Sequence, residues 1–317
     1  MTAPLAASPG DRGEPQAPRV ALITGTSSGI GLATAIAAAR AGFATVATLR
    51  EPTRAGALQE AADGAGVALD IRRLDVTDPG SVARCVDGVH EAYGRLDAVV
   101  NNAGISNFDP TLEMTTTDAL RANLEVNFFG VVEVSRAAMP LLRAARGHLL
   151  TIGSVHGVVG QPFNEAYCAA KFAVEGYMEA LAPVADAHGV KVSVVVPGFV
   201  KDTSFGIFPD INRKTIEAAS GPYAPTFADY VHWVAHQGWE GAGQTAAEVA
   251  DVVVRTLRSE RPPFRVPADP WAAAYLERKL TDRDGSVVQG LARTWIGRPP
   301  ESEDADADAD ADTEQET

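Results

Sequence analysis

Cysteines and long apolar runs are scarce in this chain of 317 residues, and their scarcity excludes several classes of protein. The two cysteines, Cys85 and Cys168, form neither a disulfide framework nor a metal-ligand spacing, which suits a reducing compartment. No apolar run approaches the roughly 18 residues that a membrane-spanning helix needs. Residues 1–17 lack the charged segment and apolar core of a secretory signal. We therefore expect a cytoplasmic protein with no membrane span and no metal site.

Basic residues are also fewer than acidic residues in this chain. The chain has 27 Lys and Arg against 41 Asp and Glu, a net charge of -14. Nine of the acidic residues and no basic residue lie in 301–317, so the rest of the chain carries a net charge of -5. A mildly acidic body argues against nucleic acid as a partner. The Asp-Ala alternation in 301–317 predicts a disordered, solvating tail, and the Ala-, Pro- and Gly-rich residues 1–17 predict a disordered arm.

From Arg19 onward, short β-branched runs alternate with Ala-rich helical stretches. The expected strands are 20–23, 44–48, 71–76, 96–100, 148–152, 191–196 and 264–266. The expected helices are roughly 29–41, 53–63, 78–93, 115–143, 165–187 and 245–259. Helices that alternate with short apolar strands are typical of βαβ units. The sequence therefore predicts an α/β fold with a doubly wound parallel sheet that is covered on both faces.

A glycine-rich loop follows the first expected strand and reads Thr24-Gly25-Thr-Ser-Ser-Gly29-Ile-Gly31. Glycines allow a tight turn and a close approach of the backbone to a pyrophosphate, and the helix N-terminus supplies unpaired N–H groups. The position of the loop, between the strand and the helix of the first βαβ unit, is the context that such a motif needs. We expect it to bind a dinucleotide.

Tyr167 and Lys171 lie four residues apart on an expected helix, so both side chains lie on one face. An ammonium beside a phenol favours the phenolate and lowers the pKa of the phenol, which makes a tyrosine a usable acid or base. By itself the spacing is also compatible with a helix surface that carries a solvated lysine. The rest of the site decides between the two interpretations.

Three motifs in order resemble the short-chain dehydrogenase/reductase family: the glycine loop, Asn101-Asn-Ala-Gly104, and Tyr167-x-x-x-Lys171. The resemblance spans roughly residues 18–266 and implies a Rossmann-type sheet of about seven parallel strands. It also implies a dinucleotide-binding catalytic domain at 18–267, with a substrate lid at 199–243 and a C-terminal extension at 268–300. The resemblance places the following residues at a nicotinamide cofactor: Gly25, Ser27, Ser28, Gly29, Ile30, Gly31, Asp75, Val76, Asn102, Ala103, Gly104, Tyr167, Lys171, Pro197, Gly198, Val200 and Thr203.

The residues after the second strand favour NADP(H), with NAD(H) possible. An acid there binds the ribose 2′-hydroxyl, whereas an Arg accommodates a 2′-phosphate. Here Leu49 stands where NAD-preferring members of the family place Asp, and Arg50 follows it. Ser27 offers a further hydroxyl, while Glu51 opposes the assignment if it turns toward the ribose. Asp75 matches the family's adenine-contacting acid, or alternatively acts as a cap of the helix that follows.

The family resemblance also implies the catalytic set Asn127, Ser154, Tyr167 and Lys171. A carbonyl that accepts hydride needs a donor on its oxygen and then a proton. Ser154 is expected to polarise the oxygen, Tyr167 to donate the proton, and Lys171 to lower the pKa of Tyr167 and bind the nicotinamide ribose. Asn127 is expected to hold a water in a proton relay to Lys171.

The 199–243 segment holds eight of the chain's 21 aromatic residues, which suggests an apolar lid over a bulky hydrophobic ketone or alcohol. Alternatively, these rings pack the segment onto the body. The residues expected to bind substrate are His156, Phe163, Phe199 and Phe205. The stretch 154–176 is similar to the 17β-hydroxysteroid and retinol dehydrogenase branch, which implies a steroid-, retinoid- or polyketide-like substrate.

Two functions from different classes stay open at this point. One is an NADP(H)-dependent carbonyl reductase or alcohol dehydrogenase, and the other is a cofactor-binding sensor or regulatory protein without turnover. The full set of four catalytic residues favours the enzyme. The helices at 115–143 and 165–187 match those through which family members pair, so we expect a homodimer or homotetramer.

Overall fold

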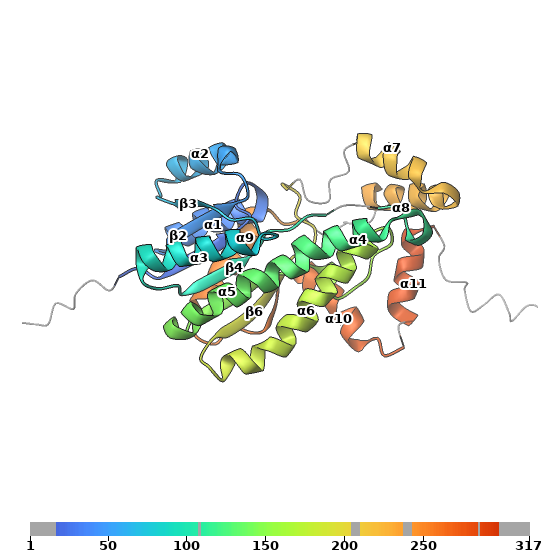
Figure 1. Ribbon diagram of the computed structural model, residues 1–317. Helices are drawn as coiled ribbons and strands as arrows, with labels where there is room; N and C mark the ends of the chain where they lie inside the picture. The colour runs from blue at the N-terminus through green and yellow to red at the C-terminus, as the bar shows by residue number, and fades with distance from the viewer. Residues whose placement is uncertain (1–16, 107–108, 204–209, 237–242, 285, 298–317) are drawn as a thin grey trace, which may run out of the picture.

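The computed structural model describes residues 17–106, 109–203, 210–236, 243–284 and 286–297. Its centre is a seven-stranded parallel sheet in the order β3-β2-β1-β4-β5-β6-β7 (Figure 1). The strands are β1 (Val20–Thr24), β2 (Ala44–Leu49), β3 (Asp70–Arg73), β4 (Ala98–Asn101), β5 (His148–Ile152), β6 (Lys191–Val196) and β7 (Arg265–Pro267). The predicted Rossmann-type sheet in a single domain is confirmed.

The inner strands are buried along almost their whole length and are mostly apolar, because both faces of the sheet are covered. In β1, Leu22 points into one hydrophobic cluster, whereas its neighbours Ala21 and Ile23 point into another. The first cluster holds residues of α3 (Pro79–Tyr93), α5 (Gly130–Ala145) and α6 (Glu165–Asp186). The second holds residues of α1 (Gly29–Arg40), α2 (Gly56–Ala65) and α9 (Ala246–Arg258). The core therefore lies in two layers, one on each side of the sheet.

Several boundaries differ from the expected ones. Strand β3 ends at Arg73, so Asp75 and Val76 lie in the turn after it. A short 3-10 turn, η1 (Pro52–Arg54), precedes α2. The helix expected at 115–143 divides into α4 (Thr117–Leu124), a π-helical turn at Glu125–Phe129, and α5. A π-helical turn inside a helix inserts one extra residue and re-aims the side chains that follow, which sequence periodicity does not reveal.

Most described residues of the segments 199–243 and 268–297, the expected lid and extension, are helical, whereas 199–203 form a non-helical stretch with an isolated bridge from Val200 to Gln244. The lid segment holds α7 (Asp210–Ala219) and α8 (Ala224–His236), and the extension holds α10 (Pro270–Thr281) and α11 (Ser286–Trp295). In Figure 1, α7, α8 and α11 gather at one end of the molecule. Two aromatic rings in contact join α8 to α11, since the ring centroids of Trp233 and Trp295 lie 5.2 Å apart with the planes tilted by 35°. No helix among the described residues is both long enough and apolar enough to cross a membrane.

Candidate active site

A cavity of about 390 Å³ lies at the carboxyl ends of the strands, where the strand order reverses between β1 and β4. Open parallel sheets bind ligands at this position. Every residue expected to bind the cofactor lines this cavity, as do Ser154, His156 and Phe199. Asn127 and Phe163 are not in its lining, and Phe205 lies outside the described residues. The sequence motifs therefore converge on one site.

The glycine loop is held tightly against the end of β4. Gly25 has φ +70°, and a Cβ there would lie 2.7 Å from the Cα of Ala103. A Cβ on Gly31 would overlap the carbonyl oxygen of Gly25. Asn102 fastens the two segments, since its Nδ2 donates to the carbonyl oxygens of Thr24 at 2.9 Å and of Gly25 at 3.0 Å. Only glycine fits these positions, so the motif is required for the shape of the loop.

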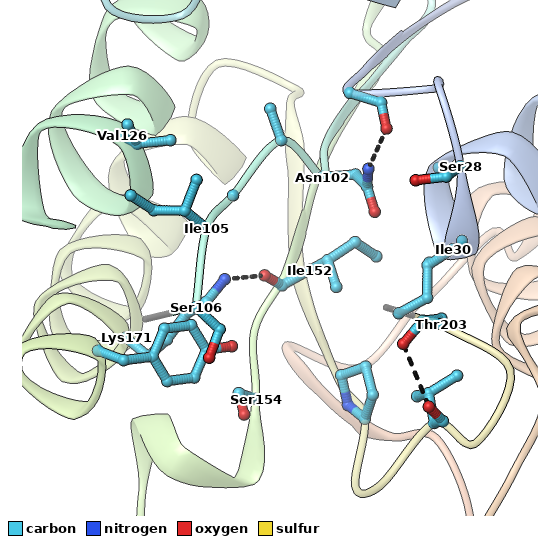
Figure 2. A pocket seen from close by; sticks show the side chains of 18 of the residues that line it. Ser28, Ile30, Asn102, Ile105, Ser106, Val126, Ile152, Ser154, Lys171 and Thr203 are labelled. Atoms are coloured by element: carbon cyan, nitrogen blue, oxygen red, sulfur yellow. Dashed lines mark hydrogen bonds between the residues drawn. The ribbon is translucent and has the colours of Figure 1, made fainter. Parts of the chain in front are cut away.

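The loop leads into α1 with unpaired backbone donors facing the cavity. Ser28 is the N-cap residue, but its side chain makes no capping hydrogen bond. The first N–H groups of a helix have no acceptor within the helix, so they are available to an anion. In Figure 2, Ser28, Ile30 and Thr203 lie on one side of the cavity, and Ser154 and Lys171 lie on the other. The geometry fits a pyrophosphate bound between the loop and Thr203.

Basic and acidic side chains surround the far end of the cavity, beyond β2. Arg50, Glu51 and Arg54 all line it, and all three are exposed. Arg54 was missed by the sequence analysis, although its position four residues after Arg50 was visible there. Asp75 also lines the cavity, and its carboxylate accepts bonds from the backbone N and the Oγ1 of Thr77 at 3.0 and 2.8 Å. Asp75 thus supports the turn before α3 as well as the cavity wall.

Ser154, Tyr167 and Lys171 meet at the opposite end. Ser154 begins the 3-10 turn η4 (Val155–Gly157), and its Oγ accepts the backbone N–H of His156 at 3.1 Å. Tyr167 and Lys171 lie one turn apart on α6, and Tyr167 is hydrogen-bonded to the side chain of Ser154. Lys171 Nζ donates to the carbonyl oxygen of Ile152 at 2.9 Å, a bond drawn in Figure 2.

Burial shifts the pKa of both side chains of this pair. Burial raises the pKa of Tyr167, and the hydrogen bond with Ser154 only opposes this rise. Burial also lowers the pKa of Lys171 to about 8. The ammonium lies 5.7 Å from the centroid of the tyrosine ring and bonds to a carbonyl, so it stands over the ring face. Burial therefore has the largest effect on the pKa of Tyr167, and the expectation that Lys171 lowers this pKa stays a prediction.

Asn127 lies in the π-helical turn and is fully buried. Its amide exchanges two hydrogen bonds with the backbone of Ile105, at 3.1 and 2.9 Å, and donates a third to Asn123 Oδ1 at 2.6 Å. Ile105 lines the cavity whereas Asn127 does not. Asn127 thus holds the segment after β4 in place from outside the cavity lining.

The aromatic residues of the lid divide between the cavity and the body. Phe199 and Tyr230 line the cavity. Phe227 is fully buried against Phe163, with ring centroids 5.2 Å apart, while Trp233 packs on the extension. Packing onto the body, the alternative considered from the sequence, thus accounts for much of the aromatic content. Gln161, Asn164 and Tyr230 are among the polar lining residues that the sequence analysis did not assign to the site. Among the described residues, no cluster of His, Cys, Asp or Glu could hold a metal ion.

Comparison with known proteins shows the family. A family model described as short chain dehydrogenase matches residues 19–208. The chain belongs to the short-chain dehydrogenase family. It is therefore an oxidoreductase that acts on CH–OH groups, as the sequence analysis predicted.

Individual relatives agree with this family. Retinol dehydrogenase 8 of Bos taurus is 34% identical over 298 residues, covering 90% of this chain and 92% of that protein. Human 17-beta-hydroxysteroid dehydrogenase type 1 is 36% identical over 296 residues, covering 90% and 88%. A metagenomic short-chain oxidoreductase solved in complex with NADP superposes with a TM-score of 0.62 at 26% identity, covering 78% of this chain and 96% of that one. The expected resemblance to the hydroxysteroid and retinol dehydrogenase branch is confirmed.

Proposed function

We propose that the protein is an NADP(H)-dependent oxidoreductase that interconverts a bulky hydrophobic ketone and the matching secondary alcohol. The observation that carries the proposal is the convergence of Ser154, Tyr167 and Lys171 with the glycine loop on one cavity. A nucleotide cofactor fits the unpaired donors at the start of α1 and the close approach of Gly25 to Ala103. The cofactor supplies the hydride to the carbonyl carbon, or accepts it in the oxidative direction.

Arg50 and Arg54 support the preference for NADP(H). Both line the cavity beyond β2, where a 2′-phosphate would lie, and neither forms an ion pair within the part of the chain that the structure describes. A guanidinium binds a phosphate with charge-assisted hydrogen bonds, which are stronger than bonds between neutral groups. Glu51 lies between them in the sequence, and its negative charge partly offsets their positive charge. A weaker use of NAD(H) is therefore compatible with the site.

The reaction assigns one task to each side chain. Ser154 donates a hydrogen bond to the carbonyl oxygen and holds it beside Tyr167 while negative charge develops there. The phenol of Tyr167 then gives its proton to that oxygen. Because its pKa is raised by burial, Tyr167 is protonated at neutral pH and ready to act as the acid in reduction. In oxidation the same groups work in reverse, with Tyr167 as the base.

A hydrophobic substrate is favoured by the lining on the substrate side and by the two relatives. Phe199, Val234 and Ile105 contribute apolar walls near the reacting centre. The relatives carry names that refer to retinol and to a hydroxysteroid, which are bulky alcohols. A steroid-, retinoid- or polyketide-like compound is the substrate class that we infer from these features.

The test is NADPH consumption over a panel of bulky ketones. Tyr167→Phe removes the proton donor and keeps the ring, so kcat should fall by about a hundredfold to ten-thousandfold, the usual contribution of a general acid. Tyr177→Phe is a matched control on the same helix, because Tyr177 is exposed and outside the cavity. Tight NADPH binding with no turnover of any ketone would instead support a sensor or regulatory protein.

We also propose that the protein forms a homodimer or homotetramer through α5, α6 and the π-helical turn. These elements carry four of the exposed large apolar side chains of the described residues, Phe129, Phe172, Tyr177 and Val184. Apolar side chains clustered on one face are typical of an interface between subunits. Sedimentation at micromolar concentration tests the proposal, and a protein that is monomeric throughout contradicts it.

A further inference from the structure

Four polar side chains surround the substrate end of the cavity, between Ser154 and the lid. They come from four different segments: η4, the loop before α6, the N-cap of α6, and α8. Each has a buried polar atom without a hydrogen-bond partner of acceptable geometry, although the side chain of His156 interacts with that of Gln161, and the side chain of Tyr230 with that of Asn164. These atoms are His156 Nε2, Gln161 Oε1, Asn164 Oδ1 and the hydroxyl of Tyr230, and all four residues line the cavity.

Three of the four side chains are almost completely buried, and His156 is partly buried with its Nε2 atom inaccessible. Gln161 is 5% exposed, Asn164 is 2% exposed and Tyr230 is fully buried. Buried polar groups in proteins are almost always hydrogen-bonded, because leaving one without a partner destabilises the fold. Several such groups around one cavity indicate a ligand that completes their bonding.

The backbone holds these side chains toward the cavity. Asn164 is the N-cap residue of α6, where an Asn side chain ordinarily bonds to the first turn, yet it makes no capping bond. Gln161 is fixed by its backbone N–H, which donates to Cys168 Sγ at 3.3 Å. Between them, Phe163 has φ +58° and packs its ring 5.6 Å from that of Tyr230. A non-glycine residue in this conformation is strained, and such strain is often kept where a site needs it.

The polar groups lie close to the reacting centre. The rings of His156 and Tyr167 are perpendicular, with centroids 5.8 Å apart, and the backbone of His156 bonds to Ser154 Oγ. A carbonyl held by Ser154 and Tyr167 therefore brings its neighbouring carbons near His156 and Gln161. The amide oxygens of Gln161 and Asn164 require a donor, whereas the Tyr230 hydroxyl can donate or accept. A hydroxyl group suits such a set, since it can donate one hydrogen bond to one of the two amide oxygens and accept a bond from the Tyr230 hydroxyl.

We propose that His156, Gln161, Asn164 and Tyr230 form a subsite for a hydroxyl group near the reacting carbonyl, so that the preferred substrate is a hydroxyketone rather than a purely apolar ketone. The inference rests on the proposed function and narrows its substrate class. The hydrophobic lining contacts the rest of the molecule, while the subsite selects for the hydroxyl and sets the orientation of the carbonyl.

Matched pairs of ketones test the subsite. Each pair consists of a phenyl ketone with a tertiary hydroxyl on the α- or β-carbon and its analogue in which a methyl replaces that hydroxyl. A tertiary hydroxyl cannot be oxidised, and the methyl keeps the shape. The wild-type enzyme should prefer at least one hydroxyl compound over its partner by about tenfold or more in kcat/KM, because a methyl leaves the buried polar groups unpaired.

Variants then assign the preference to the subsite. Tyr230→Phe and Gln161→Leu should each reduce the preference by about fivefold or more, with kcat/KM for the methyl analogue unchanged or raised. Comparing ratios cancels the intrinsic reactivity of each ketone. Tyr275→Phe is the control, since Tyr275 is a buried tyrosine outside the cavity and should leave the ratio unchanged. A wild-type ratio near one for both pairs, or a ratio that neither variant alters, overturns the proposal.

A binding measurement separates this inference from the proposed function. Calorimetry on the wild-type protein loaded with NADP⁺, which cannot reduce a ketone, gives Kd for both members of each pair. If no ketone is turned over but the hydroxyl compound still binds more tightly and Tyr230→Phe removes the difference, the subsite stands and the proposed function fails. Equal Kd values for both members overturn the subsite.

Discussion

Asn127 and Ile105 exchange two hydrogen bonds across 22 residues of sequence, one in each direction between the side-chain amide and the backbone. The bond from Asn127 to Asn123 uses the second N–H of the amide. Its side chain therefore has no free N–H with which to hold a water. Asn127 therefore positions Ile105, and the water relay expected from the family resemblance stays a prediction.

Replacing Asn127 with Leu tests this positioning role. The variant loses three hydrogen bonds and leaves their buried partners unsatisfied, at about 1–3 kcal/mol for each, so the free energy of unfolding should fall by roughly 3 kcal/mol or more. Chemical denaturation measures the loss. Asn123→Ala is the control, since it removes one of the three bonds and should cost less. A variant as stable as the wild type would show that these bonds contribute little.

The pH dependence of ketone reduction follows from Lys171. Its pKa is lowered to about 8 by burial, so the ammonium loses its proton as the pH rises through that value. A neutral Lys171 no longer stabilises the negative charge that develops on Tyr167 as its proton leaves. We therefore expect kcat/KM for reduction to be constant below about pH 7 and to fall above about pH 8. The profile should be recorded at saturating NADPH, and a constant rate up to pH 10 contradicts the assignment.

Cofactor preference gives a separate prediction at the other end of the cavity. Arg50→Ala and Arg54→Ala should each lower kcat/KM for NADPH by about tenfold to a hundredfold, since each removes a charge-assisted bond to phosphate, with little change for NADH. Arg40→Ala is the control, because Arg40 is exposed at the end of α1 and outside the cavity. If the variants leave the ratio of kcat/KM for NADPH to kcat/KM for NADH unchanged, the 2′-phosphate does not lie between Arg50 and Arg54.

Most of the fold could be predicted from the sequence because its signals are local. All seven strands were placed within three residues of their observed ends, since a strand buried on both faces is a short apolar run bounded by polar turns. The helices α7, α8, α10 and α11 were not located individually. Their stability depends on contacts with one another, such as the packing of Trp233 against Trp295, and a sequence pattern does not show which distant rings meet.

The sequence likewise predicted one part of the candidate site and not the other. The cofactor residues were found because the glycine loop and the strand ends must meet at the carboxyl edge of a parallel sheet. Gln161, Asn164 and Tyr230 were missed because their role depends on side-chain direction. From the sequence, Asn164 would be expected to cap α6, and only the structure shows that its amide lines the cavity instead. The lining is therefore more polar than the aromatic content of the lid suggested.

The last prediction concerns His148, which is buried at the start of β5 away from the cavity. Its Nε2 lies 3.0 Å from Ser193 Oγ, whose hydrogen is donated to the carbonyl oxygen of Pro263. His148 Nε2 must then carry a proton and donate it to Ser193, and the neutral ring fits best because a second proton on the buried Nδ1 would have no acceptor. Burial, aided by the charge of Lys191, lowers the pKa of His148 to about 4.

The unfolded chain binds a proton at His148 below about pH 6.5, whereas the native state does so only below about pH 4. Stability should therefore fall as the pH decreases through this window, by about 2 kcal/mol between pH 7 and pH 5 from this residue. His148→Gln keeps a donor for Ser193 and does not titrate. Its unfolding free energy should lose about 2 kcal/mol less than that of the wild type over the same interval, measured by urea denaturation at both pH values. Equal losses in the two proteins would mean that His148 does not contribute to the acid sensitivity of the fold.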